Sequence, residues 1–117
     1  MISKPLETNV RAHEKSAVIN LIGDINASAD EEMNAAFSQA LVLNPESVVL
    51  NFTEVEYINS TGIALIVGLL ATARQHKVDI LTFGLSDHYR EIFEITRLSD
   101  FMKIVEGDQA AQLVGTT

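Results

Sequence analysis

Apolar residues along the chain gather in short strand-like runs that alternate with longer runs of helical spacing. The first clear strand covers residues 17–22, is rich in β-branched residues and ends at Gly23. Ser28 followed by Glu31 predicts a capping box that opens a helix, and Pro45 predicts where that helix has ended. The apolar residues of this helix recur three and four positions apart, at Met33, Ala36, Phe37, Ala40 and Leu41.

The same alternation continues to the end of the chain. Strands are predicted at residues 47–52, 78–83 and 101–105, and helices from Ser60, from Ser86 and over 108–114. A polar turn at 11–15 separates the strand at 17–22 from one before it, which is close enough to form an antiparallel hairpin. Strands that alternate with helices imply right-handed crossovers and a largely parallel sheet, here with helices on one face. We therefore expect an α/β fold in a single domain over residues 1–117.

Composition narrows the class of function. The chain has 117 residues, 47% of them apolar, with only two prolines, which is typical of an ordered globular domain. A formal net charge of −8 argues against nucleic acids and anionic membrane surfaces as partners. Cysteine is absent, which excludes disulfides and thiolate chemistry. The longest apolar stretch is far shorter than a membrane span and the N-terminus has no signal core, so a cytoplasmic protein is expected.

The most informative segment is the uncharged run between Glu56 and Arg74. Ser60 and Thr61 fall where its helix should start, at the positive end of the helix dipole, where a phosphate is electrostatically favoured. The simpler alternative is that one of the two hydroxyls only caps the helix. The helix itself is apolar on every side, and a small one-sheet domain can hardly enclose it fully. We expect part of it to be an exposed interaction surface, with Ile63, Leu65 and Leu69 as its candidate residues.

Enzymatic chemistry has little support in the sequence. The three histidines, His13, His76 and His88, lack metal-ligand spacing, and the glycines match no phosphate-binding loop. Glu54 and Glu56 are expected in a loop, as solvated charges. Ser60 lacks the flanking glycines of a hydrolase nucleophile. We expect no catalytic activity, no metal site and no cofactor.

Residues 48–66, with the sequence VVLNFTEVEYINSTGIALI, resemble the signature of the bacterial anti-sigma factor antagonists, the STAS domain family. The turn Gly23-Asp24-Ile25-Asn26 is similar to the Gly-Glu-Leu-Asp turn of that family, and residues 85–104 resemble its C-terminal helix and strand. The resemblance extends from about residue 10 to 114 and implies a four- or five-stranded mixed sheet backed by helices mainly on one face.

The resemblance also implies a mechanism, namely partner switching. The phosphoacceptor serine of the family falls on Ser60, with Thr61 as the competing acceptor. The unmodified protein would bind an anti-sigma serine kinase, phosphorylation would end the binding, and a metal-dependent serine phosphatase would reset it. Candidate partner-binding residues are Asp24, Asn26, Asn59, Thr61, Gly62, Ile63, Leu65 and Leu69. The chain is expected to be a monomer or a weak homodimer.

The sequence departs from the family pattern at two places near the acceptor. Asn59 replaces the usual aspartate before the serine, and Asn26 replaces the aspartate of the turn. Both changes remove a carboxylate, so fewer like charges would surround an added phosphate. Two alternatives remain: an unmodified STAS scaffold or oligomerisation module, and a domain that binds a nucleotide or lipid near Asn26 and Ser60.

Overall fold

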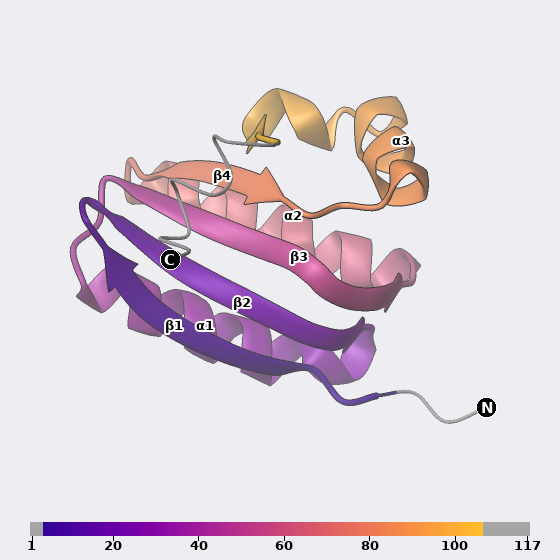
Figure 1. Ribbon diagram of the computed structural model, residues 1–117, viewed down its shortest axis with the longest axis horizontal. Helices are drawn as coiled ribbons and strands as arrows, with labels where there is room; N and C mark the ends of the chain where they lie inside the picture. Colours follow the sequence, from indigo (N-terminus) through magenta and orange to yellow (C-terminus); the bar gives the residue numbers. More distant parts are fainter. Residues whose placement is uncertain (1–3, 107–117) are drawn as a thin grey trace.

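The computed structural model describes residues 4–106, which form one five-stranded mixed sheet with helices packed behind it (Figure 1). The strands follow the sequence in space, in the order β1-β2-β3-β4-β5. They are β1 (Glu7–His13), β2 (Ser16–Ile25), β3 (Ser47–Ile58), β4 (Asp79–Phe83) and β5 (Lys103–Ile104). β1 and β2 pair antiparallel and every later pair is parallel, which confirms the predicted hairpin and the α/β fold class.

The main helices pack on one face of the sheet, as the sequence predicts. Helix α1 (Asp30–Val42) and helix α2 (Ser60–Gln75) lie behind the sheet in Figure 1, and α3 (Asp87–Ile95) lies beyond β4. Residues 4–106 also contain two short 3-10 helices, η1 (Ala27–Ala29) and η2 (Leu98–Phe101). The main core forms between this layer and the sheet, and the rings of Phe52 and Phe93 meet edge to face there at a centroid distance of 6.0 Å. The apolar face predicted for the first helix is confirmed.

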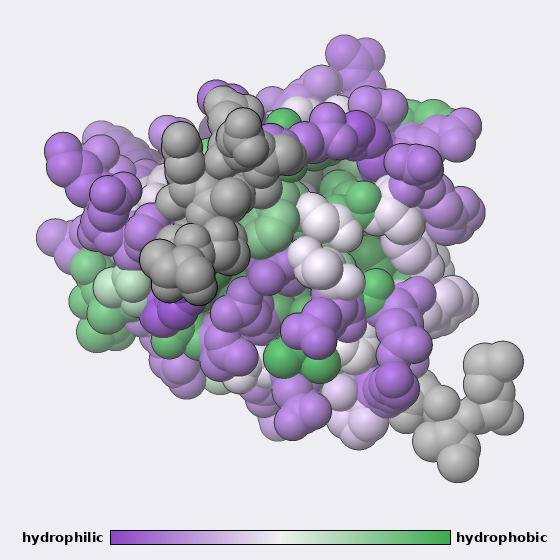
Figure 2. Space-filling model, in the orientation of Figure 1, coloured by the Kyte–Doolittle hydropathy of each residue, from purple (hydrophilic) through white to green (hydrophobic). Residues whose placement is uncertain are grey.

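The opposite face of the sheet carries a row of three asparagine side chains across β1, β2 and β3. The amide of Asn20 donates to the side chain of Asn9 at 2.6 Å, and the amide of Asn51 donates to Asn20 at 2.8 Å. Val18 and Val49, two residues earlier on their strands, form a small apolar cluster on the same face. Figure 2 shows apolar and intermediate side chains near the middle of this view, with polar ones around them.

Two strands are longer than the sequence predicts. β2 continues through Gly23 to Ile25, and β3 continues to Ile58, so Glu54 and Glu56 lie in a strand and the loop predicted there is wrong. From Thr53 to Tyr57 no residue of β3 is buried, and the register shifts against β2 begin after the Asn20–Asn51 pair. Such shifts mark β-bulges, which extend pairing without a regular alternation in the sequence.

Two local predictions at helix and strand ends are also wrong. Ser28 does not cap α1: the side chain of Asn26 caps η1 instead, and α1 follows after Ala29 without a side-chain cap. The last strand is shorter than predicted because Phe101 belongs to η2. Two other predictions are confirmed: Ser86 caps α3, and α1 ends before Pro45. The helix predicted at 108–114 lies outside the described residues.

Candidate functional site

The candidate site lies where the carboxyl ends of two neighbouring parallel strands meet. Asp24 and Ile25 of β2 pair with Tyr57 and Ile58 of β3, so the turns that follow the two strands lie side by side. The backbone N–H of Asn59 donates to the carbonyl of Ile25 at 3.2 Å and ties these turns together. The structure therefore brings Asp24 and Asn26 next to Asn59 and the start of α2, as the sequence predicts.

Asn59 is the N-cap of α2. Its backbone is extended, with φ of −93°, and its side-chain oxygen accepts a hydrogen bond from the N–H of Gly62 at 2.8 Å. Ser60 and Thr61 are thus the first two helical residues, and both are exposed. The alternative in which one of their hydroxyls only caps the helix is wrong, because the cap is already supplied by Asn59. The hydroxyl of Ser60 lies in solvent at the positive end of a 16-residue helix.

Gly62 sets how closely the first turn of α2 approaches β2. A Cβ atom at this position would lie 2.1 Å from the carbonyl oxygen of Ile25, far inside van der Waals contact. The φ of Gly62 is not in the left-handed region, so the requirement for glycine is steric. Gly62 is buried, so it supports the site through the packing of α2 against β2 and does not face a partner.

The other two predicted polar residues make local contacts. The side-chain oxygen of Asn26 accepts from both the N–H and the hydroxyl of Ser28, at 3.0 and 2.6 Å. Asp24 accepts from the backbone N–H of Lys4 at 3.0 Å and donates its own N–H to the Lys4 carbonyl. Both side chains are half-buried, so they shape the rim of the site while keeping some surface.

Lys4 is a basic residue of this rim that the sequence did not single out. Its ammonium forms an ion pair with Glu56 near the end of β3. The hydrogen bond and the charge of Glu56, with a smaller contribution from Asp24, raise the pKa of Lys4 above its ordinary value of 10.5. Nothing in the sequence signals this pair, because Lys4 and Glu56 come together only through the pairing of the chain before β1 with the end of β2.

The exposed side of α2 differs from the one expected. Leu69 is only 3% exposed and belongs to the core, so its predicted exposure is wrong. Ile63 and Leu65 are half-buried and pack against the core. Val67, 45% exposed, is the large apolar residue that α2 presents to solvent, and Tyr57, at the end of β3, is 54% exposed. The apolar surface near Ser60 therefore consists of Val67 and Tyr57, with the outer parts of the two half-buried residues.

Tyr89 is a further residue that the sequence placed only in a hydrophobic face. Its hydroxyl accepts a hydrogen bond from the N–H of Ile58 at 2.9 Å, one residue before the cap of α2. This contact fastens α3 to the end of β3, so both flanks of the candidate site are supported. Tyr89 is half-buried, and a tyrosine hydroxyl in such a place usually finds a hydrogen-bond partner, but the sequence does not indicate which one.

Across residues 4–106, no group of three histidine, aspartate or glutamate side chains is arranged to hold a metal ion. Within the same range no helix has the length and apolar character that crossing a membrane requires. What the site offers chemically is an exposed hydroxyl at a helix N-terminus beside a small apolar surface.

Known proteins share this sequence and this fold. The STAS domain family model matches residues 7–111. The anti-sigma-B factor antagonist of Listeria monocytogenes is 36% identical over 92 residues, which cover 77% of this chain and 81% of that one. A crystal structure of an anti-sigma factor antagonist from Mycobacterium paratuberculosis superposes with a TM-score of 0.74 at 17% identity, covering 97% of each chain.

The fold is also that of the Bacillus cell fate determinant SpoIIAA in its phosphorylated form. The TM-score is 0.67 at 20% identity, and the match covers 92% of this chain and 99% of SpoIIAA. The names of the relatives denote regulatory proteins, in agreement with the expectation from sequence that the chain is not an enzyme. The family model and the Listeria relative, together with the geometry above, show that the chain belongs to the STAS domain family of anti-sigma factor antagonists.

Proposed function

We propose that this chain is an anti-sigma factor antagonist that works by partner switching in the cytoplasm. In the unmodified state it binds an anti-sigma serine kinase and thereby releases the target that the kinase holds. The kinase phosphorylates Ser60, which ends the binding, and a metal-dependent serine phosphatase removes the phosphate. Ser60 is a substrate residue in this scheme, and the catalytic groups belong to the partners.

The observation that carries the proposal is the division of roles between Asn59 and Ser60. Asn59 holds the helix cap, so Ser60 is left exposed, and its modification breaks no side-chain hydrogen bond among residues 4–106. The relative whose fold matches over 99% of its length has been solved in a phosphorylated form, which is consistent with a STAS domain that accepts phosphate without refolding.

The effect on binding follows from charge. A phosphate adds about −1.5 to −2 charges at neutral pH. At the N-terminus of α2 this charge is tolerated by the folded chain, because the helix dipole favours it. In an interface that also covers Val67 and Tyr57, the same charge has to be desolvated beside apolar surface, which opposes binding. The switch would thus act on the complex and leave the domain folded.

The decisive test is a pull-down with wild type, Ser60→Ala and Ser60→Asp in parallel. Wild type and Ser60→Ala should both capture an anti-sigma kinase, whereas Ser60→Asp should capture much less. Incubation with that kinase and ATP should add one phosphate to wild type and none to Ser60→Ala. Equal capture by all three proteins, or the absence of any phosphate with a co-encoded kinase, would contradict the proposal and favour the scaffold function.

A further inference from the structure

The two edges of the sheet differ in how they are protected. β5 forms one edge with only two residues, whereas the other edge is β1, whose seven residues include no proline or glycine. β1 pairs with β2 in an unbroken register from Glu7 to His13, and Figure 1 shows it as the outer strand of the sheet. Proteins usually protect such an edge with a bulge, a proline or a very short strand. β1 has none of these, and among residues 4–106 no strand pairs with its outer side.

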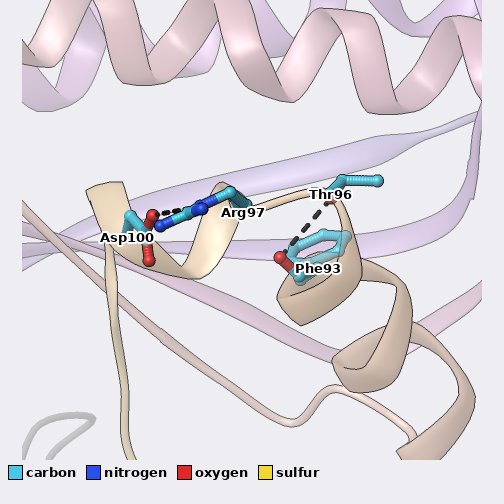
Figure 3. Close-up of polar contacts among 4 residues, drawn as sticks. All are labelled: Phe93, Thr96, Arg97 and Asp100. Carbon is cyan, nitrogen blue, oxygen red and sulfur yellow. Dashed lines mark hydrogen bonds and ion pairs between the residues drawn. The ribbon is translucent and has the colours of Figure 1, made fainter.

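The charged side chains of β1 are also of opposite sign. Glu7, Asn9 and Arg11 are exposed and alternate along the strand, so they share the face of the sheet that the main helices leave open. Neither Glu7 nor Arg11 forms an ion pair within residues 4–106, whereas Arg97 pairs at 3.0 Å with Asp100 of its own segment (Figure 3). The edge strand thus carries one acid and one base, each two residues from Asn9.

The row of asparagine side chains ends at this edge. The side-chain oxygen of Asn9 accepts a hydrogen bond from Asn20 at 2.6 Å, and its amide nitrogen has no hydrogen-bond partner in the described part of the chain. An amide oxygen has two lone pairs, and the amide nitrogen has two donors. Asn9 can therefore both donate and accept one further hydrogen bond beyond the edge of the sheet.

We propose that β1 pairs antiparallel with β1 of a second copy of this chain, around a two-fold axis at Asn9. Each Asn9 then lies opposite the same residue of the other copy, and Glu7 of each copy lies opposite Arg11 of the other. With the axis perpendicular to the sheet, the main helices of both copies stay on one face. The two five-stranded sheets become one continuous sheet, and the row of asparagines extends through both.

The charges select this register over its neighbours. An axis at Arg11 would place two guanidinium groups directly opposite each other, and an axis at Val10 would leave Glu7 with no arginine opposite it. Opposite charges across a strand pair stabilise the pair, and like charges destabilise it. The ion pairs are exposed and therefore weak, and the net charge of −8 on each copy opposes association. We expect a dissociation constant of about 10 μM to 1 mM, which gives the weak homodimer expected from the sequence a defined interface.

Charge reversal tests the interface by sedimentation velocity. Arg11→Glu and Glu7→Arg should each weaken dimerisation by about tenfold or more. An equimolar mixture of the two variants should form a heterodimer, because both opposed ion pairs are then restored. Arg74→Glu is the matched control, since Arg74 is exposed on α2, has no ion pair among residues 4–106 and undergoes the same change of charge. It should dimerise like wild type. A wild type that stays monomeric at millimolar concentration, or a mixture that does not associate, would overturn the proposal.

Cross-linking tests the register, because the chain has no cysteine of its own. In the proposed pair the two Cα atoms of residue 9 lie about 4.5–5.5 Å apart, which is within the range of a disulfide. Asn9→Cys should therefore oxidise to a covalent dimer. Ala12→Cys is the matched control: Ala12 is exposed on the same strand, but its two copies would lie about 20 Å apart and should not cross-link. Equal cross-linking of both variants, or none of Asn9→Cys, would overturn the register. Neither result bears on the phosphorylation of Ser60.

Discussion

The side-chain oxygen of Asn59 lies 2.8 Å from the backbone nitrogen of Gly62 and accepts its hydrogen bond. This one contact decides what the next residue can do. Because the cap of α2 is an amide that a kinase does not modify, the adjacent hydroxyl of Ser60 is available for chemistry. The identity of the cap, the fit of Gly62 and the exposed surface of α2 each lead to a measurable expectation.

Modification should map to Ser60 and not to Thr61. Both hydroxyls are exposed, but the family motif places the acceptor on the first of them. Peptide mass mapping after incubation with the cognate kinase should find phosphate on Ser60, and Thr61→Ala should still be modified. The folded state should change in stability by no more than about 1 kcal/mol, since a negative charge at a helix N-terminus is tolerated. Phosphate on Thr61 would move the site by one residue.

Two substitutions of Asn59 should distinguish its role as the cap of α2 from the effect of a carboxylate at the same position. Asn59→Ala removes the hydrogen bond to Gly62 and should lower the free energy of unfolding by about 0.5–2 kcal/mol, measured by chemical denaturation. Asn59→Asp keeps an acceptor at the cap and should be as stable as wild type or more so. An Asn59→Ala protein with unchanged stability would show that the cap contributes nothing. If the kinase reads the acid that the family usually carries here, Asn59→Asp should also be phosphorylated faster.

Two glycines of α2 should respond in opposite directions to the same substitution. Gly62→Ala places a methyl group 2.1 Å from the carbonyl oxygen of Ile25 and should cost about 1–3 kcal/mol of stability. Gly68→Ala meets nothing within 4 Å and should gain about 0.5–1 kcal/mol from helix propensity. Denaturation curves of the two variants provide the comparison. Equal effects would mean that the close approach of α2 to β2 is absent in solution.

Val67→Lys should weaken the complex with the kinase by about tenfold while changing stability by less than about 0.5 kcal/mol. The reason is that Val67 is exposed in the middle of α2, near the proposed interface. Val42→Lys, on α1, is the matched control because that valine is 83% exposed and lies on another helix. Leu69 is unsuitable as a probe, since truncation of this buried side chain should cost about 2–5 kcal/mol. Unchanged affinity of Val67→Lys would exclude this part of α2 from the interface.

Lys4 should make stability fall at alkaline pH. Its pKa is raised in the folded chain, so its stabilising contribution is complete below the ordinary value of 10.5 and is lost as the pH rises through the raised value. Lys4→Met should therefore show a smaller loss of stability than wild type above pH 10.5. Lys103→Met, which removes a lysine without an ion pair in the described range, should follow wild type. The effect should be small because the Lys4 side chain is 69% exposed. Parallel alkaline curves for Lys4→Met and wild type would exclude the Glu56 pair as a stabilising contact.

Features that depend on local periodicity could be predicted from the sequence. Met33, Ala36, Phe37 and Ala40 recur at helical spacing, and the structure buries all four. The sequence also predicts a strand that is followed by a helix beginning at Ser60, and that order is confirmed.

Features that depend on contacts between distant segments could not be predicted. In α2 the uniform apolar sequence does not indicate which side faces the core, so packing alone decides that Leu69 is inside and Val67 outside. The choice of cap among Asn59, Ser60 and Thr61 depends on the hydrogen bond between the Asn59 N–H and Ile25 on another strand. The continuation of β3 past Phe52 likewise depends on bulged pairing with β2. An open cavity of about 800 Å³ at the end of α2 remote from Ser60 is lined by residues of five elements, α2, β3, β4, η2 and β5, and no local sequence pattern predicts it.

The row of Asn9, Asn20 and Asn51 affects the register in which β1, β2 and β3 pair. Side chains alternate between the two faces of a strand, so a slip of one residue would turn these amides toward the helices and turn side chains of the main core outward. Such a slip would bury polar groups in the core without hydrogen-bond partners, which costs free energy. Asn20 and Asn51 also form the last regular pair before β3 bulges. Asn20 and Asn51 therefore favour a single register of β2 against β3. In that register the carboxyl ends of the two strands, which are followed by Asn26 and Asn59, lie side by side.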